Sequence, residues 1–326
     1  MAAPLDGIDG LRRLATTCAG VRPEERCLLV TDSRADQTVV DAMSVVLRTL
    51  GAEVAVISSE PVALPGDEPP AAVRGAMGEP EVDVIFELTS IFAGSSQARR
   101  DACARGARYI TVPGLSWRTL RPGGPFEADF AALGEHAQRL GARFDAASEF
   151  HLVSALGTDL RGSFEGRAGR PLWGIVDQPG GYGAPPDIEV GAAPVEGTAE
   201  GTVVVDGSLL FLSDDQLPAP VTLRFAGGEL ADAAGPQAHL LVDALASADD
   251  DRMTNLAEVS IGLNPFSRPG GSALELEGIV GGAHVALGNN VAYGGSVAAR
   301  SHIDCALLAA ELRLDGEPVD PAWAAA

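Results

Sequence analysis

The strongest constraint on the fold is a strand–helix–strand order that occurs twice in the first 125 residues. The first copy comprises an apolar run at 27–32, a stretch with helical spacing at 39–50, Gly51, and a second apolar run at 53–57. The second copy comprises 82–86, 96–107 and 109–112. Parallel strands need a helix between them, so this order predicts a Rossmann-like α/β domain with a parallel sheet. The turn after the first strand, TDSRADQ, lacks G-x-G-x-x-G, so we expect a scaffold and no dinucleotide site.

The sequence changes character after a predicted amphipathic helix at 126–147. Short β-rich runs then alternate with Asp-Gly and Gly-Gly pairs, which are typical of hairpin turns. The runs and their turn pairs are 202–205 with Asp206-Gly207, 221–225 with Gly227-Gly228, and 312–314 with Asp315-Gly316. One helix is predicted among them, at 237–248. We therefore expect a first domain over 1–150, which ends with the bridging helix, and an α+β domain rich in antiparallel sheet over 151–326.

The charge of the chain excludes several classes of function. The chain has 45 acidic and 23 basic residues, a net charge of −22, and every basic residue is arginine. Schiff-base chemistry, pyridoxal phosphate anchoring and the Walker-type phosphate loop each require a lysine, so all three are excluded. A chain this acidic repels phosphate backbones and anionic lipids, so we expect neither nucleic acid nor a membrane as a partner.

The cysteines and the N-terminal residues indicate a cellular compartment. Cys18, Cys27, Cys103 and Cys305 show no CxxC spacing, which favours free thiols over a disulfide framework or a zinc knuckle. The first residues contain no apolar run typical of a signal peptide, and no stretch reaches the ~20 apolar residues needed to cross a bilayer. We therefore expect a cytoplasmic protein.

Two of the five histidines lie in settings that suit metal binding. His302 and Asp304, in the run SHID, are two residues apart, so on a strand both would project from one face with their Cα atoms about 6–7 Å apart. His284 lies in an apolar run between glycines, GGAHVALG, where the backbone permits close approach. A satisfied core histidine is the alternative interpretation of His284.

Two glutamates adjoin apolar runs upstream of these histidines. Glu258 lies in AEVSIG and Glu189 in PDIEV. A carboxylate buried there must be paired, protonated or metal-bound, because burying a bare charge is costly. Imidazole and carboxylate donors without a thiolate suit Zn, Mn, Fe(II) or Co. One ion held by two histidines and Asp304, or two ions bridged by Glu258, would both satisfy this donor set.

Several of these runs together resemble a known superfamily. They are AEVSIGLNP at 257–265, GGAHVALGNN at 281–290, YGG at 293–295, SHID at 301–304 and LDG at 314–316, with GTD at 157–159 and APVEGTAEG at 193–201. They resemble the aminopeptidase T-like leucyl aminopeptidases, whose superfamily also contains 2,5-dihydroxypyridine 5,6-dioxygenase, a non-haem Fe(II) enzyme. The resemblance spans most of residues 150–316.

The resemblance implies roles for individual residues. In the peptidases, two glutamates, two histidines and an aspartate form a di-metal site, which implies that role for Glu189, Glu258, His284, His302 and Asp304. In the dioxygenases a single iron is held by two histidines and an aspartate, and the final pair would again be His302 and Asp304. Glu165 would act as an acid or base under either activity, with a surface role as its alternative, and in the hydrolase Glu165 or Tyr293 would transfer protons. Homodimers are also implied.

Three functions follow as alternatives. The first is a metal-dependent hydrolase that acts on an amide or peptide-type bond of a small molecule or short peptide, with Zn, Mn or Co as one or two ions. The second is a mononuclear Fe(II) dioxygenase that opens a hydroxylated aromatic ring. The third is a non-catalytic binding protein that a metal stabilises. In each of them residues 151–326 hold the metal.

Overall fold

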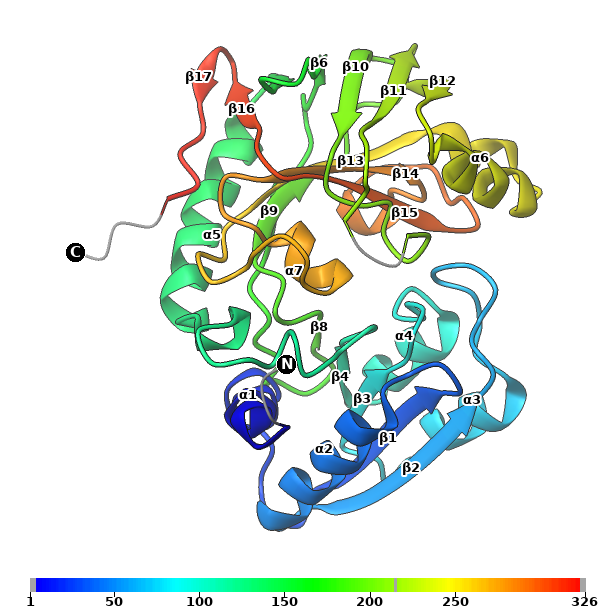
Figure 1. Ribbon diagram of the computed structural model, residues 1–326, viewed down its shortest axis with the longest axis vertical. Helices are drawn as coiled ribbons and strands as arrows, with labels where there is room; N and C mark the ends of the chain where they lie inside the picture. The colour runs from blue at the N-terminus through cyan, green and yellow to red at the C-terminus, as the bar shows by residue number, and fades with distance from the viewer. Residues whose placement is uncertain (1–3, 214–215, 323–326) are drawn as a thin grey trace. The chain divides into compact units, whose positions relative to one another are not determined.

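The computed structural model describes residues 4–213 and 216–322 (Figure 1). The chain divides into two compact units, one formed by Met1–Ala131 with Trp173–Asp187 and the other by Ala132–Leu172 with Ile188–Ala326. This division differs from the expected boundary at residue 150. The chain returns to the first unit because a two-residue strand, β8 (Tyr182–Gly183), pairs with β4 (Arg108–Thr111) and extends its sheet.

The first unit is built on a five-stranded parallel sheet, sheet A, with the strand order β2-β1-β3-β4-β8. Its remaining strands are β1 (Arg26–Asp32), β2 (Glu53–Ser59) and β3 (Val84–Leu88). Its helices are η1 (Pro4–Gly7), α1 (Ile8–Arg13), η2 (Leu14–Cys18), α2 (Gln37–Thr49), α3 (Ala71–Met77), α4 (Gln97–Ala104) and η3 (Pro125–Glu127). Side-chain caps fix the start of two of them: Asp36 accepts a hydrogen bond from the Thr38 N–H, and Ser96 from the Arg99 N–H. Both predicted strand–helix–strand units are present.

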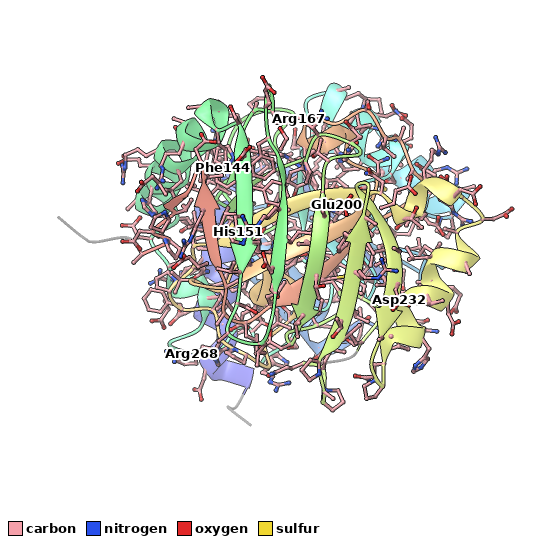
Figure 2. All side chains as sticks on the ribbon, turned by 90° about the horizontal axis from the view of Figure 1, so that it is seen from above. Phe144, His151, Arg167, Glu200, Asp232 and Arg268 are labelled. Carbon is pink, nitrogen blue, oxygen red and sulfur yellow. The ribbon has the colours of Figure 1, made fainter. Side chains whose placement is uncertain are left out.

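The second unit contains a seven-stranded antiparallel sheet, sheet B, in the order β12-β11-β10-β6-β5-β16-β17. Figure 2 views its strands side by side, with His151, Glu200 and Asp232 labelled on them. The strands are β5 (Glu149–Val153), β6 (Asp159–Ser163), β10 (Glu200–Val205), β11 (Val221–Ala226), β12 (Glu229–Ala234), β16 (Glu311–Leu314) and β17 (Glu317–Pro318). The bridging helix, α5 (Phe130–Ala146), places Phe144 against Phe164, which stacks on Phe150 of β5.

The predicted hairpin turns are partly correct. Gly227-Gly228 joins β11 to β12 and Asp315-Gly316 joins β16 to β17, as expected. Asp206-Gly207 is different, because β10 and β11 pair across a longer connection, 206–220. Gly207 instead lies against Ala306, and its N–H donates to the Ala306 carbonyl. A glycine is required there because an added Cβ would lie 2.7 Å from that carbonyl oxygen.

A second antiparallel sheet in this unit, sheet C, has the order β15-β14-β13-β9-β7 (Figure 1). Its strands are β7 (Arg170–Leu172), β9 (Glu189–Ala192), β13 (Leu256–Gly262), β14 (Ala283–Gly288) and β15 (His302–Leu307). The other helices of the unit are α6 (Ala238–Ser247), η4 (Asp251–Thr254), α7 (Ala273–Glu277) and η5 (Val291–Tyr293). The α/β and antiparallel halves expected from the sequence are thus both present.

Among residues 4–213 and 216–322, no helix combines the length and the apolar character that a membrane span requires.

Candidate metal centre

The candidate metal centre lies on one face of sheet C, where small residues leave room for larger polar ones. Side chains alternate between the two faces of a strand, so every second residue shares a face. On β15 this places His302 and Asp304 on the polar face and the buried Ile303 on the other, as predicted. Facing positions on the neighbouring strand are Gly288 and Ala286. This face of the sheet therefore combines small residues with imidazoles and carboxylates.

Five predicted ligands converge on this face from four neighbouring strands. His284 Nε2 lies 3.1 Å from Glu189 Oε2 and 3.3 Å from Glu258 Oε1. His302 Nε2 lies 3.1 Å from both Glu258 Oε2 and Asp304 Oδ1. The five residues thus form two groups of three, each able to hold a metal ion, and Glu258 belongs to both. In this structure Glu258 has the position of a bridging carboxylate.

The burial of these groups fits a bound cation. Glu258 is fully buried, His284 is 1% exposed and Glu189 is 2% exposed. Two buried carboxylate oxygens, Glu189 Oε2 and Glu258 Oε2, accept no well-directed hydrogen bond from the described residues, although each lies 3.1 Å from an imidazole Nε2. Unsatisfied buried oxygens are costly, and a divalent cation would satisfy both. The residues present therefore fit a metal ion, with an oxygen- and nitrogen-rich donor set that suits Zn, Mn, Co or Fe(II).

One nitrogen of the His302 ring forms a hydrogen bond with the backbone, and the other faces the candidate metal centre. Its Nδ1–H donates to the backbone carbonyl of Asn289 at 2.6 Å. Metal-ligating histidines commonly donate their second ring N–H in this way, which fixes the tautomer and the ring orientation. Nε2 is consequently the nitrogen that faces Glu258 and Asp304. His284 differs, because its Nδ1 is buried without a hydrogen-bond partner.

Without a cation, mutual attraction keeps the imidazoles protonated. Burial acts to lower the pKa of His284, but the charges of Glu189 and Glu258 outweigh it and raise the pKa to about 10. Burial also acts to lower the pKa of His302, but the neighbouring Asp304 and Glu258 raise it well above its usual value. Burial would raise the pKa of Glu258, but the adjacent imidazoles of His284 and His302 lower it to about 2. Glu189 retains a raised pKa because of burial and the nearby Glu258 charge.

Tyr293 joins this centre, and its ring lies parallel to that of His302 with centroids 5.5 Å apart. Its hydroxyl donates to Glu189 Oε1 at 3.2 Å. Burial and the charge of Glu189 raise the pKa of the Tyr293 hydroxyl well above its usual value, so it stays protonated at neutral pH. The Arg170 guanidinium lies 4.4 Å above the same ring. The predicted proximity of Tyr293 to the metal ligands is therefore present.

Glu165 is the predicted site residue that the structure does not bring to the cluster. It lies on the exposed turn after β6, where its backbone N–H donates to Ser163 Oγ. Within the described part of the chain, its carboxylate makes no hydrogen bond or ion pair with the five ligands. The surface alternative describes its position better than a role beside the metal.

Two contributors were missed in the sequence. Ser260 donates from its hydroxyl to Glu258 Oε1, and Arg170 covers Tyr293. Ser260 follows Glu258 by two residues, so strand alternation contained the signal that the two share a face. Arg170 left no such signal, because it lies on β7, more than 100 residues before Tyr293.

Comparison with known proteins identifies the family. The sequence profile of 2,5-dihydroxypyridine 5,6-dioxygenase matches residues 9–321. The chain belongs to the 2,5-dihydroxypyridine 5,6-dioxygenase family. A search of curated proteins found no match.

Two solved structures share the fold of this family member. The 2,5-dihydroxypyridine dioxygenase of Pseudomonas putida has 17% sequence identity and a TM-score of 0.74, covering 98% of this chain and 96% of that one. AmpT of Thermus thermophilus has 17% identity and a TM-score of 0.68, covering 97% of this chain and 98% of that one. The resemblance to the superfamily of aminopeptidase T and the dioxygenase is thereby confirmed.

Proposed function

We propose that this chain is a metal-dependent dioxygenase that opens the ring of a hydroxylated aromatic or pyridine substrate. The observation that carries this proposal is the dioxygenase profile, which matches nearly the whole chain, residues 9–321. The expected hydrolase is thus less well supported than the oxygenase alternative. Three ligands at one end of the cluster, Glu258, His302 and Asp304, would hold the iron. This set has one imidazole and two carboxylates, and so differs from the two histidines and one aspartate that the resemblance implies.

The surrounding residues would orient the substrate and control protons. Iron(II), when bound, supplies open coordination positions for a ring hydroxyl and dioxygen. The neutral Tyr293 hydroxyl can donate a hydrogen bond to a substrate oxygen in place of Glu189. Arg170, above the Tyr293 ring, adds positive charge that attracts an ionised hydroxyl or a carboxylate. These groups favour an anionic, planar substrate.

A hydrolase with two metal ions is the second candidate, and one observation favours it. Glu258 directs one oxygen to each imidazole, and Glu189 completes a second group of three ligands beside the first. Ions held by these residues would supply Lewis-acid activation of an amide carbonyl and of the attacking water. Under this activity Tyr293 would stabilise the developing charge on the carbonyl oxygen.

Metal analysis combined with two substrates tests the proposal. Protein purified without oxygen would be assayed for iron and zinc per chain, for oxygen consumption with 2,5-dihydroxypyridine, and for cleavage of leucine p-nitroanilide. Oxygen consumption that requires iron, is lost on air oxidation and returns with ascorbate supports the dioxygenase. Two ions per chain with amide cleavage alone would overturn it in favour of the hydrolase. Metal binding with neither activity on a panel of both substrate types would favour the binding protein.

A further inference from the structure

The loop between β14 and β15 supplies two contacts to the candidate metal centre. We call residues 289–296 the Tyr293 loop. Its Asn289 carbonyl accepts the hydrogen bond from His302 Nδ1–H, and its Tyr293 contacts both His302 and Glu189. The orientation of one imidazole thus depends on where this loop lies. The helical part of the loop is the three-residue η5, so its position depends on contacts with other segments. Backbone hydrogen bonds supply some of them, from the Ala193 N–H to the Tyr293 carbonyl and from the Asn289 N–H to the Ser301 carbonyl, and side chains supply the others.

A carboxylate outside the cluster holds this loop. Glu196 Oε1 accepts three hydrogen bonds from it: Asn290 Nδ2 at 2.9 Å, the Ser296 N–H at 2.8 Å and Ser296 Oγ at 3.0 Å. Its other oxygen, Oε2, pairs with Arg167, labelled in Figure 2. Arg167 in turn donates to the Gly294 carbonyl of the same loop. Both Glu196 oxygens therefore act on the Tyr293 loop, one directly and one through Arg167.

The chemistry of this contact requires an ionised carboxylate. All groups around Glu196 are donors, so each of its oxygens must act as an acceptor. Burial acts to raise the pKa of Glu196, but the hydrogen bonds from Ser296 and Asn290 outweigh it and lower the pKa to about 2. The side chain of Glu196 is 28% exposed and that of Arg167 is 14% exposed, so both groups are partly shielded from solvent. A glutamine at position 196 would keep only one acceptor oxygen. Its NH₂ group would then face either Arg167 or the donors of Asn290 and Ser296, and would accept no hydrogen bond from them.

We infer that Glu196 is a positioning residue for the metal centre. It anchors Asn290, the neighbour of Asn289, and so fixes the carbonyl that orients His302, while its hold on Ser296 and Gly294 keeps Tyr293 over the imidazole. The inference rests on the proposed function only in taking His302 as a metal ligand. It assigns Glu196 no contact with substrate or metal.

The hydrogen bond of His302 provides a test that needs neither metal nor substrate. In metal-free protein labelled with ¹⁵N-histidine, the His302 Nδ1–H signal is assigned by its absence in His302→Ala, and its exchange with water is measured. Glu196→Gln should accelerate that exchange at least tenfold, and Ser296→Ala, which removes one donor, should accelerate it less. The Kd for Zn²⁺ should rise about 10- to 100-fold in Glu196→Gln, as for other groups that orient a ligand.

Controls make the outcome decisive. Glu317→Gln removes an exposed carboxylate on β17 and should change neither quantity. Unchanged exchange and unchanged Zn²⁺ affinity in folded Glu196→Gln would overturn the inference, and if that variant does not fold, unchanged exchange in Ser296→Ala overturns it. Because exchange is measured without metal, accelerated exchange supports the inference even if the protein proves to have neither proposed activity.

Discussion

Glu258 lies between the two imidazoles, with Oε1 towards His284 and Oε2 towards His302. Ser260 donates a hydrogen bond to Oε1, so the carboxylate is held on both sides. A charge buried this deeply requires compensation. Protons on the imidazoles provide it in the metal-free protein, and a cation would provide it in the loaded protein. Glu258 is thus the residue whose loss should affect every ion in the centre.

Replacing Glu258 and Asp304 separately tests this shared position. We expect Glu258→Gln to lower Zn²⁺ affinity at least about 100-fold at every position, since even a group that only orients a ligand contributes 10- to 100-fold. Asp304→Asn should weaken only the position formed with His302. Calorimetric titration gives the affinity and the number of ions for each variant. Wild-type stoichiometry and affinity in Glu258→Gln would contradict the assignment.

The pKa of His284 predicts how metal affinity depends on pH. Its folded-state pKa is raised to about 10, so at pH 7 the metal-free imidazole carries a proton that a metal ion must displace. Zn²⁺ affinity should therefore increase as pH rises from 7 towards 10. Binding at pH 8 should release about one proton per imidazole ligand.

Proton release is measured by calorimetry in buffers of different ionisation enthalpy. His284→Ala is the matched variant, and it should release about one proton fewer. A pH-independent affinity between 7 and 9 would show that the imidazoles are neutral before the metal binds.

At the scale of elements, the centre depends on how closely β9 and β13 approach. Gly191 of β9 pairs with Ser260 of β13, and an added Cβ on Gly191 would lie 2.6 Å from the Ser260 Cβ and overlap its hydroxyl. This close approach brings Glu189 and Glu258, which flank the pair, into one cluster. The absence of a side chain at 191 is thus a condition for the site.

Gly191→Ala should disturb both the strand pairing and the site. We expect the free energy of unfolding to fall by about 1–3 kcal/mol, as in other overpacked positions, and Zn²⁺ affinity to fall with it. Gly75→Ala is a control in helix α3, where an added Cβ meets nothing within 4 Å, and it should raise stability by about 0.5–1 kcal/mol. Urea denaturation measures both, and equal stability of the two variants would contradict the packing argument.

The same elements show what periodicity can predict. The alternation of His302, Ile303 and Asp304 on β15 could be predicted from the sequence, because strand geometry alone places every second residue on the same face. The parallel strands of sheet A could be predicted because segments with apolar residues at helical spacing separate them. Strand β8 could not be predicted, since two residues are too few to show an alternating pattern. Its pairing with Tyr109 arises from the tertiary fold.

At the scale of the whole molecule, the site combines residues from distant parts of the sequence. Patterns within runs of a few residues indicated the five ligands Glu189, Glu258, His284, His302 and Asp304, and resemblance added Tyr293. Position in sequence could not indicate Glu196, which reaches Ser296 across 100 residues. Glu165 was expected near the metal because of its local run, but nothing in that run determines which way the turn projects.

Metal removal should be visible in the stability of the whole chain. A cation that binds only the folded state at 100 times its Kd stabilises that state by about 2.7 kcal/mol. We expect chelation to lower the denaturation midpoint of the wild-type protein and to leave that of Glu258→Gln nearly unchanged. Chemical denaturation with and without Zn²⁺ measures the difference. Equal stabilisation of both proteins would place the bound ion elsewhere.

The distribution of ligands over β9, β13, β14 and β15 has an evolutionary consequence. Strands β9, β13 and β14 contribute one ligand each and β15 contributes two, so a single substitution would remove one ligand and leave those on the other strands in place. A scaffold of this kind can diverge in chemistry faster than in shape. The Pseudomonas dioxygenase and the Thermus AmpT both have this fold at 17% identity to this chain.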